Sequence, residues 1–223
     1  MSAHSWIDDH KFWIASHWLQ QDEKPVPRQL SPNRGGRLKP EIIVLHETAS
    51  PLTVQGDIDW LGSAKSGVSA HLVIGRDGSV TQLVPFDTIA WHCEPAKYKG
   101  RGNVNDYSIG IEMDGPGHMT ESRPGYAKPW FDKEYSMAEH GIAFVETPDH
   151  GKGWWMPFTD PQIRTTIALC KLLVETYDIE DVTTHYAISP RRKVDPNPLF
   201  PIYWARMLAL GKDKYQAQPM GRA

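Results

Sequence analysis

The chain is poor in cysteine. Of its 223 residues only Cys93 and Cys170 are cysteines, and their positions show no paired spacing. Two thiols in a chain of this length argue against a disulfide framework and are typical of a reducing compartment or of indifference to redox conditions. The first nine residues also lack a basic start followed by an apolar run, so we recognise no secretory signal peptide. We therefore expect a cytoplasmic protein, whose export would require another route, such as a phage holin or a dedicated secretion machine.

Long apolar runs and a strong net charge are missing as well. No stretch approaches the roughly 18 apolar residues of a membrane span, so none is expected. The formal net charge of −3 excludes the strongly basic surface that typifies nucleic-acid binding, and we expect no nucleic-acid partner. The nine tryptophans, by contrast, are many for this length. They could fill the core, or they could form a stacking surface for sugar rings.

The apolar pattern predicts several strands. Continuous runs of β-forming residues at 41–45 and 108–113 are typical of strands buried on both faces. Residues 69–85 alternate between apolar and polar around an Asp77-Gly78 turn, which indicates a hairpin.

Helices are predicted between and after these strands. Residues 53–64 favour a helix weakly. A stronger helix begins at Thr159, where Thr-Asp-Pro-Gln forms a capping box with an early proline, and runs to about Tyr177. Residues 203–210 indicate a last helix. This order of elements predicts an α/β fold in which helices flank one central mixed β-sheet.

The organisation expected is that of a single domain over residues 36–211. Residues 1–35 are interpreted as an N-terminal arm packed on the domain, and residues 212–223 as a polar tail. Residues 114–158 contain glycine, proline and several large aromatic side chains without periodicity. So long a stretch without a repeat is predicted to be an aromatic-rich loop or lid.

Three ionisable side chains stand at the ends of predicted strands, namely His46, Glu112 and His185. The carboxyl edge of the strands is where open α/β sheets bind ligands. A lone histidine there is more often structural, and Asp195 could simply begin a turn. Two strand-end histidines with an aspartate ten residues after the second nevertheless predict a catalytic zinc with one position open for water.

Several ordered motifs carry a resemblance to a known family. They are His-Glu-Thr at 46–48, Ser-Ala-His-Leu-Val-Ile-Gly-Arg-Asp-Gly at 69–78, Ala-Trp-His at 90–92, Asn-Asp-Tyr-Ser-Ile-Gly-Ile-Glu at 105–112, and His185 through Asp195. From about Pro40 to Leu210 the chain resembles the zinc-dependent N-acetylmuramoyl-L-alanine amidases of the peptidoglycan-recognition and muropeptide-recycling superfamily. It is most similar to the branch that holds the anhydro-muropeptide recycling amidases and related phage endolysins.

The resemblance implies a role for each matching residue. His46, His185 and Asp195 would bind one zinc ion per chain. Glu112 would activate the attacking water and pass its proton to the leaving amine. Lys193 would stabilise the oxyanion that develops on the amide carbonyl.

This sequence departs from some relatives in that family. Certain branches place a tyrosine where this chain has Ala70, and a cysteine ligand where it has Asp195. A mechanism based on a neutral tyrosine is therefore not expected, and Glu112 would take over its task.

Four further residues are candidates for substrate binding. His71 could orient a metal ligand or be a satisfied core group. Trp91 and His92 could line the substrate groove or pack within the sheet, and Asn105 could hold the peptide stem.

The function implied is hydrolysis of the amide between N-acetylmuramic acid and L-alanine. The substrate would be either intact peptidoglycan or a soluble anhydro-muropeptide. The missing signal peptide and mild acidity favour the soluble substrate, whereas the N-terminal arm and the tryptophans favour the wall. The alternative from another class is a non-catalytic peptidoglycan-recognition module, which binds muropeptide without cutting it.

Overall fold

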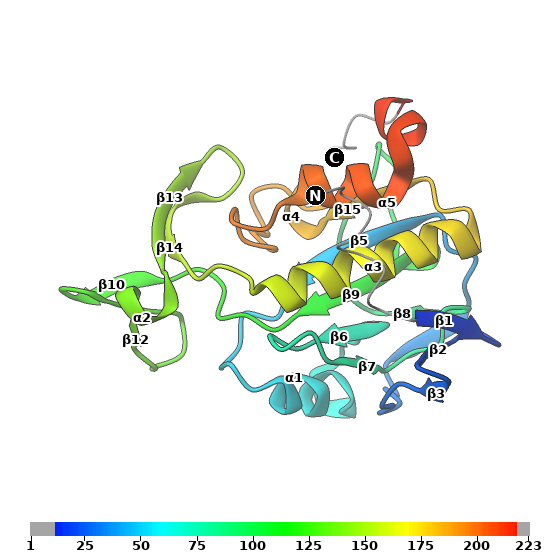
Figure 1. Ribbon diagram of the computed structural model, residues 1–223, viewed down its shortest axis with the longest axis horizontal. Helices are drawn as coiled ribbons and strands as arrows, with labels where there is room; N and C mark the ends of the chain where they lie inside the picture. Colours follow the sequence, from blue (N-terminus) through cyan, green and yellow to red (C-terminus); the bar gives the residue numbers. More distant parts are fainter. Residues whose placement is uncertain (1–11, 218–223) are drawn as a thin grey trace.

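The computed structural model describes residues 12–217 and is built around one five-stranded sheet (Figure 1). The strand order is β15-β5-β9-β6-β7. The bounds of these strands are Asp181–Thr184 for β15, Ile42–Glu47 for β5, Ser108–Met113 for β9, Leu72–Ile74 for β6 and Val80–Gln82 for β7. The first four are parallel and β7 is antiparallel, so the predicted mixed sheet is confirmed.

The two faces of this sheet are buried against different partners. In β5, Ile43 and Leu45 belong to the main core, whereas Ile42 and Val44 belong to a second cluster on the opposite face. Helix α3 (Asp160–Tyr177) contributes Ile167 and further apolar residues to the main core and lies across that face of the sheet (Figure 1). Because side chains alternate along a strand, the even-numbered residues of β5 face away from α3.

The helices follow the predicted signals closely. The Thr159 hydroxyl accepts a hydrogen bond from the Gln162 amide at the start of α3, which confirms the predicted N-cap, whereas the Gln162 side chain donates to Ile74 and Asp114 and does not complete the capping box. Helix α5 (Ile202–Ala217) extends past the predicted end, with a break at Gly211, whose φ is 72°. The shorter helices are α1 (Val54–Leu61), α2 (Met137–His140), α4 (His185–Ile188) and the 3-10 turns Ala64–Ser66 and Val104–Tyr107.

The N-terminal part of the described chain forms small sheets rather than an irregular arm. Strands β1 (Phe12–Ala15), β2 (Trp18–Gln21) and β3 (Lys24–Pro25) pair with one another, and β4 (Arg34–Arg37) pairs with β8 (Thr88–Ala90). Leu19 is fully buried in the main core. Residues 1–11 of the predicted arm and 218–223 of the predicted tail lie outside the described residues, and residues 212–217 belong to α5.

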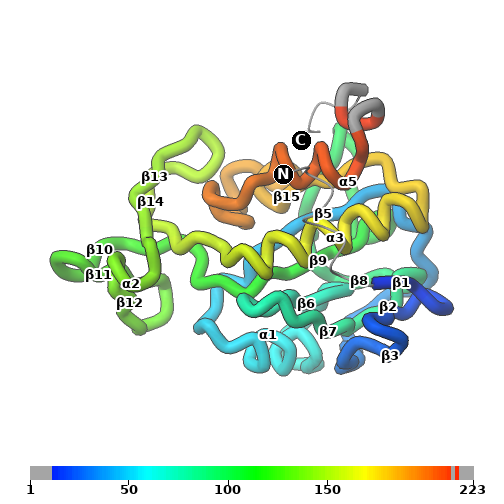
Figure 2. The backbone as a smooth tube through the Cα atoms, viewed as in Figure 1, coloured from blue at the N-terminus to red at the C-terminus, as the bar shows by residue number. Residues whose placement is uncertain are grey.

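The prediction of a long loop at 114–158 is wrong in its main respect. Most of this stretch forms strands: β10 (Thr120–Arg123), β11 (Tyr126–Lys128) and β12 (Tyr135–Ser136) in one sheet, and β13 (Ala143–Thr147) with β14 (Gly151–Trp155) in a hairpin. Met119, Ala127, Tyr135, Ile142 and Met156 form a separate apolar cluster there. Residues 115–158, which we call the projecting segment, extend from one side of the molecule (Figure 2).

Within residues 12–217, no helix has both the length and the apolar character that crossing a membrane requires.

Candidate active site

The sheet brings three of the predicted residues to one edge. His46 lies in β5 and is the register partner of Glu112 in the parallel strand β9. His185 directly follows β15, on the other side of β5. Because parallel strands end at the same edge, the three side chains meet at the carboxyl ends of the strands.

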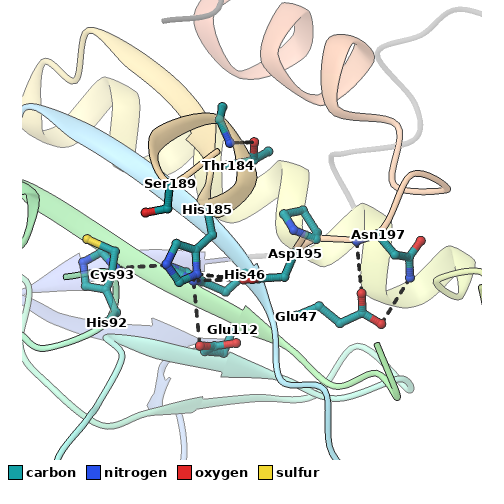
Figure 3. A network of polar contacts seen from close by, with 12 residues as sticks. His46, Glu47, His92, Cys93, Glu112, Thr184, His185, Ser189, Asp195 and Asn197 are labelled. Atoms are coloured by element: carbon teal, nitrogen blue, oxygen red, sulfur yellow. Dashed lines mark hydrogen bonds and ion pairs between the residues drawn. The ribbon is translucent and has the colours of Figure 1, made fainter. Parts of the chain in front are cut away.

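His46, His185 and Asp195 form a compact cluster, drawn in Figure 3. His46 Nδ1 lies 2.9 Å from His185 Nδ1 and 3.3 Å from Asp195 Oδ2, and His185 Nδ1 lies 3.0 Å from the same oxygen. A tetrahedral zinc with bonds of about 2.0–2.1 Å needs ligand atoms about 3.3 Å apart. Two imidazole nitrogens and one carboxylate oxygen at these distances fit a catalytic zinc site.

The charge states suit that ligand set. Burial, aided by the neighbouring His185, lowers the pKa of His46 to about 4, so the ring is neutral near pH 7 and its nitrogen can bind a cation. Burial opposes ionisation of Asp195, but the two histidines outweigh it and hold the pKa of that carboxyl well below its usual range.

The loop that carries Asp195 is fixed by hydrogen bonds. The Tyr186 amide donates to the Asp195 carbonyl at 2.9 Å, which folds the loop back onto α4. The Lys193 amide donates to the Ser189 carbonyl at 3.0 Å. These bonds place Asp195 beside His185 although ten residues separate them in the chain.

Glu47 was not singled out in the sequence, yet it holds two loops at this site. It is 5% exposed, and its carboxylate accepts from the Asn197 amide (3.0 Å), the Asn197 side chain (3.1 Å) and the Gly117 amide (3.0 Å) (Figure 3). Burial raises its pKa to about 7 against the effect of these donors. The sequence signal available was a carboxylate inside an otherwise apolar strand, beside a candidate ligand.

Glu112 faces the cluster from β9. Its Oε1 lies 4.0 Å from His46 Nδ1, and its buried Oε2 has no hydrogen-bond partner among residues 12–217. Burial and the nearby Asp195 carboxylate raise its pKa well above the ordinary value. A carboxyl group with a free oxygen and a raised pKa is suited to accept and return a proton.

Lys193 lines a cleft that opens beside the cluster. The cleft has a volume of about 380 Å³. Glu47, Lys193 and Asp195 line it together with Lys128, Trp130 and Trp155 of the projecting segment. Trp130 is 80% exposed, and its indole donates to the Ala49 carbonyl at 2.7 Å.

The four predicted substrate-binding residues occupy different environments. His71 is fully buried, with Nδ1 accepting from the Gly110 amide and Nε2 bonded to the Thr88 carbonyl, so it is a satisfied core group that cannot touch substrate. Trp91 is 41% exposed and does not line the cleft.

His92 and Asn105 are also buried rather than open to the cleft. His92 Nδ1 lies 3.0 Å from His46 Nε2, so it contacts a candidate metal ligand instead of substrate. The Asn105 side-chain oxygen accepts from the His92 and Cys93 amides at 3.1 Å each and holds that turn in place. The structure thus departs from the prediction for both residues, because each points into the protein.

A family model described as N-acetylmuramoyl-L-alanine amidase matches residues 36–198. The chain is 29% identical over 211 residues to the 1,6-anhydro-N-acetylmuramyl-L-alanine amidase AmpD of Citrobacter freundii, covering 86% of this chain and 91% of the relative. It is 34% identical over 145 residues to AmpD of Escherichia coli (strain K12), covering 64% of this chain and 58% of that protein.

Solved structures of such proteins share the fold. A selenomethionine derivative of AmpD aligns with a TM-score of 0.56 at 27% identity, covering 92% of this chain and 98% of the other. AmiD from E. coli, in complex with anhydro-N-acetylmuramic acid-L-Ala-D-gamma-Glu-L-Lys, aligns with a TM-score of 0.55 at 25% identity, covering 89% of this chain and 64% of the other.

Proposed function

The chain belongs to the N-acetylmuramoyl-L-alanine amidase family, and we propose from this that it hydrolyses the amide between N-acetylmuramic acid and L-alanine in a soluble anhydro-muropeptide. The observation that carries the proposal is Glu112, a buried carboxyl with a free oxygen beside the His46–His185–Asp195 cluster. The bound substrate of AmiD and the names of the AmpD relatives support the substrate class.

The cluster of His46, His185 and Asp195 would hold one zinc ion. Zinc there would supply Lewis acidity, polarising the amide carbonyl and lowering the pKa of a water molecule to roughly 7. The neutral His46 imidazole and the ionised Asp195 carboxylate are in the protonation states that such binding requires.

Glu112 moves the proton in this proposal. Its carboxylate takes the proton of the attacking water at the free Oε2 and then gives it to the departing amine of L-alanine. Burial and the nearby Asp195 carboxylate raise the pKa of Glu112, which makes its carboxylate a stronger proton acceptor than an exposed glutamate. Lys193, which lines the cleft, would stabilise the negative charge that develops on the amide oxygen.

The projecting segment would bind the substrate. Trp130 offers an exposed aromatic face, and Lys128 a positive charge, to the cleft that Asp195 also lines. A stem peptide carries carboxylates and the muramyl ring carries apolar faces, so the two side chains suit opposite ends of the substrate.

The test is release of stem peptide from purified anhydro-muropeptide, with zinc, after chelation, and in Glu112→Gln. We expect chelation to abolish release and Glu112→Gln to reduce kcat by about 10²- to 10⁴-fold, with zinc still bound. Glu180→Gln, which neutralises an exposed carboxyl away from the cleft, is the matched control and should keep full activity.

Three outcomes would overturn the proposal or part of it. Equal rates for the wild type and Glu112→Gln would remove Glu112 from the chemistry. Stoichiometric zinc with no release from either muropeptide or sacculi would favour the recognition module instead. Faster release from sacculi than from muropeptide would replace the soluble substrate by the intact wall.

A further inference from the structure

A chain of buried hydrogen bonds runs away from the metal-facing side of His46. His46 Nε2 lies 3.0 Å from His92 Nδ1, His92 Nε2 lies 3.0 Å from Ser108 Oγ, and Ser108 Oγ lies 2.6 Å from the Val104 carbonyl. His46, His92 and Ser108 are 1%, 8% and 0% exposed. His46 Nε2 and both ring nitrogens of His92, which do not face the metal-binding cluster, therefore have hydrogen-bond partners inside the protein.

The Val104 carbonyl, the last acceptor, sets the direction of every hydrogen bond in this series. A carbonyl oxygen can only accept, so the single hydroxyl proton of Ser108 goes to Val104. Ser108 Oγ must then accept from the His92 Nε2–H group. A neutral His92 with its proton on Nε2 has a lone pair on Nδ1, which accepts from the His46 Nε2–H group.

The consequence for His46 is a defined tautomer. With its proton on Nε2, His46 has a lone pair on Nδ1, the atom 2.9 Å from His185 Nδ1 and 3.3 Å from Asp195 Oδ2.

Strand β9 is shaped to hold the His92 ring. A Cβ atom at Gly110 would lie 2.5 Å from His92 Cγ, so only glycine lets the ring lie against the strand at this point. Ser108 stands two residues earlier on the same face. The Asn105 side chain accepts from the His92 amide at 3.1 Å and fixes the backbone. Three residues of one short stretch thus position a side chain that touches no substrate.

We propose that His92 and Ser108 are positioning residues, which hold His46 in the tautomer whose Nδ1 can bind a metal ion. The proposal rests on the metal site of the proposed function, but not on the identity of the amide that is cut. Ordinarily the second nitrogen of a metal-bound histidine donates to a carboxylate, a backbone carbonyl or a water molecule. A histidine acceptor can reverse its direction, and Ser108 prevents that reversal here.

Removing the Ser108 hydroxyl should let the hydrogen bonds from His46 through His92 to Ser108, which we call the relay, reverse their direction. In Ser108→Ala the buried His92 Nε2–H group loses the hydroxyl that accepts from it, which favours the His92 tautomer that donates from Nδ1. His46 Nε2 must then accept, and its proton moves to Nδ1, where it blocks the metal. We expect zinc affinity, measured by competition with a chromophoric chelator at pH 7.5, to fall about 10- to 100-fold.

Two variants control for the loss of a buried hydroxyl. Ser69→Ala removes a hydroxyl that donates to the Asn33 carbonyl at 2.6 Å and accepts from the Trp91 amide at 2.9 Å, outside the relay. It should leave zinc affinity within about 3-fold of wild type, because it leaves the His46 environment intact. Ser108→Thr keeps the hydroxyl and should likewise leave zinc affinity within about 3-fold of the wild-type value.

The tautomer of His46 can be measured directly by NMR, first in the wild type. In the zinc-free wild type at pH 7.5, ¹⁵N chemical shifts of the His46 ring should show a protonated Nε2 and a bare Nδ1. Ser108→Ala should shift His46 toward the protonated Nδ1 form. A purely structural role for Ser108 would change stability without moving these shifts.

The proposal is overturned if wild-type His46 carries its proton on Nδ1. It is also overturned if Ser108→Ala binds zinc as tightly as Ser69→Ala does. Because neither readout depends on substrate, failure of the proposed amide hydrolysis would leave both results interpretable. A relay confirmed in a protein that cuts no muropeptide would refute the proposed function alone.

Discussion

A buried ion pair joins helix α5 to β15, the strand that leads into His185. Asp181 in β15 is 0% exposed and Arg206 in α5 is 2% exposed. Arg206 donates to Asp181 Oδ1 from Nη2 at 2.5 Å and from Nε at 3.1 Å, while the Tyr98 hydroxyl donates to Oδ2 at 2.9 Å. Removing Arg206 would leave the carboxylate buried without its counter-charge. Breaking such a pair costs about 3–5 kcal/mol.

We therefore predict that Arg206→Met lowers the free energy of unfolding by about 3–5 kcal/mol. For a chain of this size that corresponds to a fall in Tm of roughly 6–20 °C. Urea denaturation of the zinc-free protein measures the change without a contribution from metal binding. Arg101→Met is the matched control: Arg101 Nη1 lies 2.6 Å from Glu41 Oε2, but the two side chains are 56% and 38% exposed. Its loss should cost less than about 1 kcal/mol.

A double variant separates the buried charge from lost packing. Asp181→Asn combined with Arg206→Met removes both charges and should recover most of the stability lost by Arg206→Met alone. The reasoning is refuted if Arg206→Met costs no more than Arg101→Met. It is equally refuted if the double variant is no more stable than the single one.

Two further predictions concern a buried histidine and the cleft wall. Burial lowers the pKa of His71 to about 4 in the folded protein, against about 6.5 in the unfolded chain. Between pH 6.5 and 4 the imidazole is therefore protonated in the unfolded state but not in the folded state. The free energy of unfolding should fall by up to about 3 kcal/mol as the pH decreases through this range. His71→Gln, which keeps a donor and an acceptor, should flatten the pH dependence of urea unfolding, and an unchanged slope would contradict this. Trp130→Ala should raise KM for muropeptide about 10-fold with little change in kcat, because the indole contributes binding surface rather than chemistry. Trp60→Ala, which removes a 57% exposed indole outside the cleft, should leave KM and kcat unchanged. If Trp60→Ala and Trp130→Ala raised KM equally, Trp130 would not belong to the binding surface.

The sheet and α3 could be predicted because their signals are local. Strand β9 has the predicted bounds, and α3 begins at its predicted cap. The meeting of His46, Glu112 and His185 also followed from sequence, since parallel strands place their carboxyl ends at one edge.

What could not be predicted depends on contacts between distant segments. Strands β13 and β14 contain glycine, lysine and glutamate, so their pairing depends on register within the hairpin rather than on an apolar pattern. His92 and Ser108 are 16 residues apart, and only the packing of the 92–105 turn against β9 brings them together. Alternation alone left the orientation of His92 open between the groove and the protein interior.

The projecting segment leaves the main body and returns to it at a single place. The Gln162 side-chain amide at the start of α3 donates to the Asp114 carbonyl at 2.9 Å and to the Ile74 carbonyl at 3.2 Å, which joins the end of β9 to the start of α3. A loop closed at such a junction changes in length at little entropic expense, since each doubling adds only about 0.6 kcal/mol. The main sheet can therefore accept foreign or shortened insertions within residues 120–149, which leaves the bonds of Gly117 to Glu47 and of Met156 to Asn197 in place. Exchange of that stretch would alter the breadth and charge of the cleft while His46, Glu112 and His185 keep their places.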